Sequence, residues 1–217
     1  MRVLIISLAA IATSASAQSS VDCNAVKNSS VPVELGYHFS NGTRLFAQSF
    51  RDKSGDYIIW IKSLPPPSSP NSGPAITKTT YNNGFAACTE SWSDRWAHGS
   101  GHHVINLVPA GFPKNFDRRS DATYKAHSTI TYDDNSTSGN NNYTYTYKFK
   151  SEGTVVVGSC VLDVVHGELD TTDDATGKTF HGFSAYYPEL QISTTNGNAE
   201  PIADSISTQF SAIEPSK

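Results

Sequence analysis

The sequence predicts an all-β protein, either an antiparallel sandwich or a strongly curved, partly closed sheet of about ten short strands. Three observations support this fold class. Apolar and polar residues alternate with period two in several segments, and turn residues separate these segments at regular intervals. The composition is rich in Asn, Ser, Thr, Gly and Tyr, which is typical of strands and turns rather than of helices.

The first three predicted strands form an antiparallel meander. Apolar residues alternate with other residues from Val31 to Phe39, and the Asn41-Gly42 pair that follows is a strong hairpin signal. A return strand spans Arg44–Phe50, and a third strand spans Tyr57–Lys62 after a polar turn. Three strands joined by short turns pair most simply as neighbours in one sheet.

The remaining strands alternate with polar turns along the chain. A turn at Glu152-Gly153 precedes the segment Thr154–His166, which is apolar on both faces and is therefore placed in the middle of a sheet. Gly167–Lys178 is predicted to be a polar connection. The further strands are Thr77–Tyr81, Phe85–Trp92, His103–Val108, Thr123–Tyr132, Tyr143–Phe149, Thr179–Tyr187 and Leu190–Thr195.

The N-terminus has the features of a cleavable secretory signal peptide over residues 1–17. Arg2 supplies a positive charge, Val3–Ala12 is apolar, and Ala15-Ser16-Ala17 is a small-residue cleavage site. The apolar run is about half of the roughly 20 residues that a membrane span needs. No cysteine stands at the cleavage site to carry a lipid. The expected product is a secreted or periplasmic chain that does not span a membrane.

The predicted mature chain, residues 18–217, is expected to form a single all-β domain. The proline-rich residues 63–74 are read as a long loop inside that domain, because the short stretch between the cleavage site and this loop rarely holds a core of its own. A linker between two domains is the alternative. The tail, residues 199–217, fits a helical face or a strand equally well and is expected to be loose.

The charge balance excludes one class of partner. The formal net charge is −4, and no run of Lys and Arg exceeds two residues. Because nucleic acids and anionic membrane surfaces repel such a chain, neither is expected as a partner.

The three cysteines are expected to meet an oxidising compartment after export. Cys88 and Cys160 both follow apolar strand residues, which favours a Cys88–Cys160 disulfide. A bridge from Cys23 that fastens the N-terminus is the close alternative, and three unpaired thiols are the third possibility.

The densest group of candidate metal ligands is His98, His102 and His103. Imidazoles bind zinc well, and three of them leave one coordination position open for a water. The group is not the H-E-x-x-H helix pattern, and a polar loop with solvated histidines is the favoured interpretation. No cofactor is predicted.

Aromatic side chains supply the main binding hypothesis. Tyr143, Tyr145 and Tyr147 lie on one face of a predicted strand, and Trp92 and Trp96 are further candidates. An exposed aromatic face stacks on sugars or covers an acyl chain. The favoured alternative is that these tyrosines belong to the core.

Two acidic residues invite a catalytic hypothesis. Glu168 and Asp170 share one side of an extended segment, and a pair of carboxylates can hydrolyse a glycosidic bond. A solvated acidic turn is the favoured interpretation, because turns commonly contain Asp.

Three functions remain open at this stage. The first is an exported, non-catalytic β-sheet module that binds an apolar or sugar ligand in the cell envelope or the extracellular space. The second is a metal-assisted hydrolase that uses the three histidines. The third is a structural or interaction protein that uses the proline-rich loop.

Overall fold

A computed structural model of the chain describes residues 21–28, 30–51, 57–65, 75–82, 85–96, 99–107, 116–132, 137–197 and 199–213. The predicted signal peptide and most of the proline-rich loop lie outside these residues. Twelve strands and one short helix are described. The elements are α1 (Cys23–Lys27), β1 (Val33–His38), β2 (Arg44–Arg51), β3 (Tyr57–Leu64), β4 (Ala75–Asn82), β5 (Phe85–Trp96), β6 (Gly99–Leu107), β7 (Ala122–Tyr132), β8 (Thr137–Val157), β9 (Cys160–Asp173), β10 (Thr179–Tyr187), β11 (Ile192–Asn196) and β12 (Ser205–Ser207).

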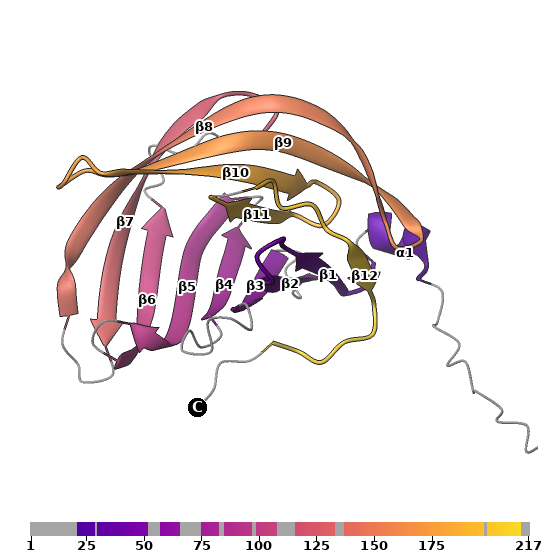
Figure 1. The fold of residues 1–217 in the computed structure, drawn as a ribbon, viewed down its shortest axis with the longest axis horizontal. Helices are drawn as coiled ribbons and strands as arrows, with labels where there is room; N and C mark the ends of the chain where they lie inside the picture. The colour runs from indigo at the N-terminus through magenta and orange to yellow at the C-terminus, as the bar shows by residue number, and fades with distance from the viewer. Residues whose placement is uncertain are drawn as a thin grey trace, which may run out of the picture.

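The strands form one strongly curved antiparallel sheet, which confirms the predicted fold class (Figure 1). Neighbours in the chain are neighbours in the sheet from β1 to β11, and only β12 departs from this order by pairing with β1. The sheet bends so that β8, β9 and β10 arch over β1, β2 and β3 (Figure 1). In the described residues, no helix is long and apolar enough to cross a membrane.

The first hairpin forms where the alternation predicts it. The side chains of Val33, Leu35 and Tyr37 are buried on one face of β1. At the turn, Phe39 N–H donates to Thr43 O at 2.9 Å. The turn glycine, Gly42, has φ 85°, a conformation that residues with a Cβ rarely adopt.

The predicted turn at Glu152-Gly153 is wrong, because β8 continues through both residues to Val157. The chain reverses instead at Gly158, whose φ of 58° suits a tight turn, and Val157 pairs directly with Cys160. The predicted strand Thr154–His166 is therefore the closed end of the β8–β9 hairpin. The predicted polar connection after His166 is also wrong, since β9 continues to Asp173.

The hydrophobic core lies between the first strands and the last strands of the sheet. These two ends of the sheet contact each other through opposite faces. The register connects Leu35 in β1, strand by strand, to Tyr145 in β8 and Thr171 in β9 on one face. We call this face A and the opposite one face B. The core residues of β9, Leu162 and Val164, lie an odd number of positions from Thr171 and so belong to face B.

Strand twist accounts for this arrangement. Adjacent strands rotate by about 20–25°, so the eight steps from β1 to β9 accumulate a rotation of roughly 160–200°. The bend brings the ends together, and the twist turns face B of the far end toward face A of β1. Across this contact, the hydroxyl of Ser49 in β2 donates to Leu190 O at 2.7 Å.

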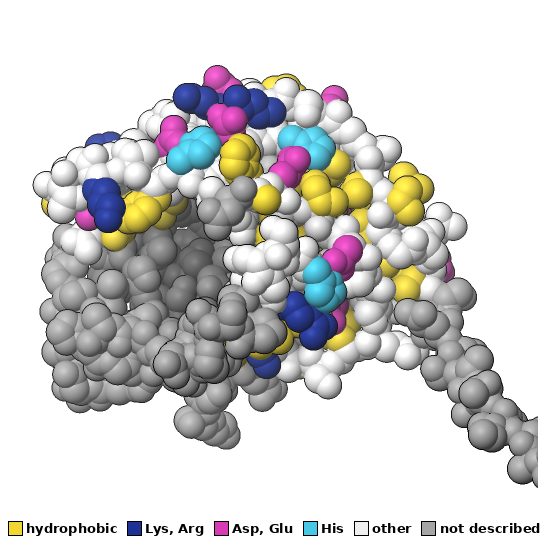
Figure 2. Space-filling model, viewed as in Figure 1, with side chains coloured by type: hydrophobic (Ala, Val, Ile, Leu, Met, Phe, Trp, Pro, Cys, Tyr) yellow, Lys and Arg dark blue, Asp and Glu magenta, His cyan; other side chains and the backbone are white. Residues whose placement is uncertain are grey.

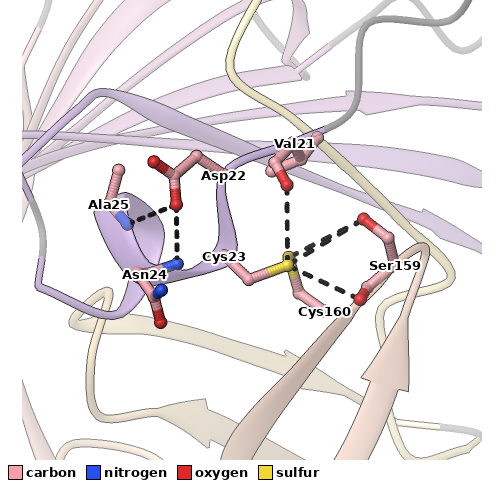
Figure 3. The surroundings of a disulfide bond; sticks show 7 residues. All are labelled: Val21, Asp22, Cys23, Asn24, Ala25, Ser159 and Cys160. Carbon is pink, nitrogen blue, oxygen red and sulfur yellow. Dashed lines mark hydrogen bonds between the residues drawn. A yellow bond between two sulfur atoms is a disulfide. The ribbon is translucent and has the colours of Figure 1, made fainter.

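A disulfide between Cys23 and Cys160 joins α1 to the β8–β9 hairpin (Figure 3). Asp22 caps the helix by accepting from Asn24 N–H at 3.0 Å and Ala25 N–H at 3.1 Å. The two bonded cysteines are 137 residues apart in the chain, and their Cα atoms are 5.4 Å apart.

The favoured Cys88–Cys160 pairing is therefore wrong, and the alternative bridge from Cys23 is confirmed. The Gly158 turn places Cys160 at the closed end of its hairpin, where α1 lies against β9. Cys88 belongs to β5, four strands away from β9 in the sheet.

The last described residues cross face B of β2. Gln48 is fully buried there, donates to Ser211 O at 2.8 Å and accepts from Ile213 N–H at 2.9 Å. The rings of Phe50 and Phe210 pack edge to face with centroids 5.8 Å apart. We call residues 208–213 the C-terminal segment.

Candidate functional site

The predicted tyrosine stripe lies on face A of β8, where its last member is buried outside the main core cluster. Tyr147 is 1% exposed and its ring packs against Phe116, with centroids 5.4 Å apart. Gly167 on β9 makes room for it, since a Cβ there would lie 2.3 Å from the Tyr147 hydroxyl oxygen. Arg118 lies over the rings of Tyr147 and Tyr186.

The other two tyrosines of the stripe are only half-buried. Tyr145 stacks on Tyr124 of β7, with ring centroids 5.1 Å apart and an angle of 6° between the planes. Burial, with a smaller contribution from the neighbouring phenols of Tyr124 and Tyr143, raises the pKa of Tyr145 to about 12. This part of the stripe remains a candidate binding surface.

The backbone register places four of the other predicted residues in neighbouring strands. Trp92 pairs with His102, and Ser91 pairs with His103, between β5 and β6, while Trp96 lies at the end of β5. His98 lies outside the described residues, as do the side chains of the other four predicted residues. In the described residues, no three His, Cys, Asp or Glu side chains are grouped so that they could hold a metal ion. The metal hypothesis stays a prediction.

A surface pocket of about 320 Å³ opens on face B of β8, β9 and β10. We call it the Phe183 pocket, after the half-buried aromatic ring in its lining. Charged side chains surround this ring. The pocket is lined by Lys150, Ser151, His166, Gly167, Glu168, Phe183 and Glu200.

The sheet register brings most of these residues together. Glu168 in β9 pairs directly with Phe183 in β10, and His166 pairs with Ser151 in β8. Directly opposed residues have Cβ atoms about 4.5–5.5 Å apart, so their side chains meet on one face. Lys150 is the extra residue of a β-bulge, a feature that redirects a side chain out of the regular alternation.

Every ionisable side chain in the pocket has a partner of complementary character. Lys150 Nζ lies 3.0 Å from Glu168 Oε1, and His166 Nδ1 contacts Glu200 Oε1. Glu200 belongs to the segment between β11 and β12, so this contact fastens that segment to β9.

A second histidine–carboxylate pair flanks the pocket. His181 Nδ1 lies 2.6 Å from Asp170 Oδ1, and the His181 ring packs against Phe183 with centroids 5.4 Å apart. Such pairs are a feature of this side of the molecule, since histidine side chains on the face seen in Figure 2 lie beside acidic side chains. Hydrogen-bonding side chains therefore surround the aromatic ring of Phe183.

The sequence indicated only part of this site. The shared side of Glu168 and Asp170 was correctly recognised, but both lie in β9 and not in a solvated turn. Phe183, His166 and Glu200 were missed. The predicted strand Thr179–Tyr187 was the one signal that placed Phe183 on a defined face. The sequence did not show which residues of the neighbouring strands lie beside it on that face.

Comparison of the chain with known protein families, with curated proteins and with solved structures finds no match.

Proposed function

We propose that the protein is an exported binding module that holds a sugar in the Phe183 pocket. The observation that carries this proposal is one aromatic ring surrounded by charged hydrogen-bonding side chains in a single surface pocket. A sugar ring combines an apolar C–H face with a rim of hydroxyls, and this pocket offers a partner for each.

The polar groups suit hydroxyls better than they suit an apolar ligand. Carboxylates accept hydrogen bonds from sugar hydroxyls, and the lining offers two of them, Glu168 and Glu200. An apolar ligand would instead cover the charges of Glu168, Glu200 and Lys150 without hydrogen bonds, which costs free energy. The volume of about 320 Å³ lies at the small end of the range of ligand sites, which fits a single sugar unit.

The disulfide supports the exported location. Disulfides form and persist in secreted and periplasmic compartments, and are rare where thiols are kept reduced. The first cysteine of the Cys23–Cys160 bridge lies six residues after the predicted signal peptide of residues 1–17. Both features favour a protein that meets glycans outside the cytoplasm.

A glycan array, followed by titration calorimetry of the best ligand, tests the proposal. Phe183→Ala should weaken binding at least about tenfold, because it removes the stacking ring. Phe180→Ala is the matched control, since Phe180 lies on face A of the same strand and is 55% exposed. The proposal is wrong if no glycan binds, or if the two variants bind the ligand equally well.

A further inference from the structure

We infer that the sugar bound in the Phe183 pocket carries an ammonium group, so that the ligand is an amino sugar. This inference rests on the proposed function and names the class of sugar.

Carboxylates outnumber cations around Phe183. Glu168 and Glu200 line the pocket, and Asp170 lies two residues after Glu168 in β9, on the same face. Among the described residues, Lys150 is the one Lys or Arg side chain in the lining, and Lys148 of β8 pairs with Glu168 on the same face. Leaving the histidines out of the count, these three carboxylates and two lysines have one negative charge in excess, and such a site attracts a cationic ligand and repels an anionic one.

The Lys150–Glu168 pair shows where a ligand ammonium would bind. Lys150 Nζ lies 3.0 Å from Glu168 Oε1, so the carboxylate already accepts from an ammonium at hydrogen-bond distance. The carboxylate side chain is 24% exposed, whereas the lysine side chain is 50% exposed and has a flexible stem.

The exposed lysine can be displaced at little cost. Ion pairs between exposed side chains contribute little to stability, because water solvates the separated charges well. A ligand ammonium that takes the place of Lys150 Nζ keeps the hydrogen bond to Glu168 and releases the lysine to solvent. Lys150 is therefore a competitor for the ligand position.

The Phe183 ring adds a second attraction for a cation. The face of an aromatic ring carries partial negative charge and attracts an ammonium close to it. Glu168 is the direct cross-strand partner of Phe183, so a ligand that reaches this carboxylate lies beside the ring. A sugar with an amino substituent presents its ammonium and its C–H face together, which matches this pair of residues.

Titration calorimetry with two oligosaccharides of equal length tests the inference. One is built of glucosamine and the other of N-acetylglucosamine, which lacks the positive charge. The glucosamine oligomer should bind about tenfold more tightly, the equivalent of one charge-assisted hydrogen bond. Glu168→Gln should abolish this preference, and Lys150→Met should raise the affinity for the glucosamine oligomer by removing the competing ammonium.

Glu152→Gln is the matched control, because Glu152 pairs with Arg119 outside the pocket. It should leave both affinities unchanged, and circular dichroism should show that all variants are folded. Tighter binding of the N-acetylated oligomer, or a preference that survives Glu168→Gln, would overturn the inference. If the N-acetylated oligomer binds more tightly, the proposed function still stands, since a neutral sugar then occupies the pocket. Loss of affinity in Lys150→Met would also overturn it, by making the lysine a ligand-binding group.

Discussion

Two glycines near the β8–β9 turn have different surroundings, since Gly158 forms the turn and Gly153 lies inside β8. Gly158 has φ 58°, and a Cβ there would lie 3.0 Å from the Ile206 side chain. Gly158→Ala should lower the free energy of unfolding by about 1–2 kcal/mol, since left-handed backbone disfavours a Cβ. Urea denaturation measures this change.

Gly153 provides the control for this prediction. It lies inside β8, and a Cβ there would meet nothing within 4 Å. Gly153→Ala should raise the free energy of unfolding by about 0.5 kcal/mol, because alanine loses less backbone entropy in a strand. Equal effects of the two alanines would contradict the assignment of the turn to Gly158.

The same two glycines show where prediction from sequence fails. Glycine marks turns and also occurs in strands, and only its conformation distinguishes the two cases. Glu152-Gly153 looks like a turn because it is polar, and Gly158 looks like strand because valines precede it. The candidate site could not be predicted from the sequence for a related reason. Phe183 and Glu168 are neighbours only because of the register between β10 and β9, which the position of each turn determines.

At the scale of elements, alternation predicted the strands well. The buried positions of β1 and the single face shared by the odd-numbered tyrosines of β8 are both as the period of two requires. This pattern can be predicted from the residues of each strand alone. The position of the C-terminal segment on β2 could not be predicted in this way, because its hydrogen-bond partner Gln48 is 163 residues away from Ser211 in the chain.

Gln48 should be the residue that holds the C-terminal segment on β2. Besides its bonds to Ser211 and Ile213, its amide donates to Glu34 Oε2 at 2.6 Å. Gln48→Ala should lower the free energy of unfolding by about 2–3 kcal/mol, because it leaves buried polar groups without partners. Limited proteolysis should then cleave the C-terminal segment faster.

Gln209→Ala is the control for this prediction. Gln209 is exposed, and its hydrogen bonds to Ser207 use backbone atoms, so the variant should behave like the parent. Slow cleavage of the C-terminal segment in Gln48→Ala would show that the aromatic contact of Phe210 is sufficient to hold it.

At the scale of the whole molecule, the disulfide should be the largest single contribution to stability. It closes a loop with a sequence separation of 137 residues. The chain-entropy model assigns about 4–5 kcal/mol to a loop of this size. The double variant Cys23→Ala and Cys160→Ala should lose stability of this order in chemical denaturation. A peptide map of the parent should recover the two cysteines in one linked fragment, and a fragment linking Cys88 instead would contradict the structure.

Alkaline pH should unfold the protein by ionising tyrosines that are buried or half-buried in the folded state. Burial is the main cause that raises the pKa values of Tyr145, Tyr147 and Tyr187 to about 12, above the ordinary value of 10.0. The folded state keeps these protons while the unfolded state releases them. The stabilisation is therefore complete below pH 10 and is lost as the pH rises through 12. The ultraviolet absorbance of tyrosinate should rise together with the loss of circular dichroism in this interval. Ionisation of all tyrosines without unfolding would contradict the burial.

The meeting of opposite faces in the core has a consequence for biosynthesis. Each hairpin from β1 to β11 joins neighbours in the chain, so a growing polypeptide can form these pairs as it leaves the ribosome. The inner surface of β1 has no cover until β9, β10 and β11 have been translated, and its edge has no partner until β12 follows. A nascent chain lacking its last quarter would expose this apolar surface. The first strand made thus completes its contacts last, when synthesis of the chain is almost complete.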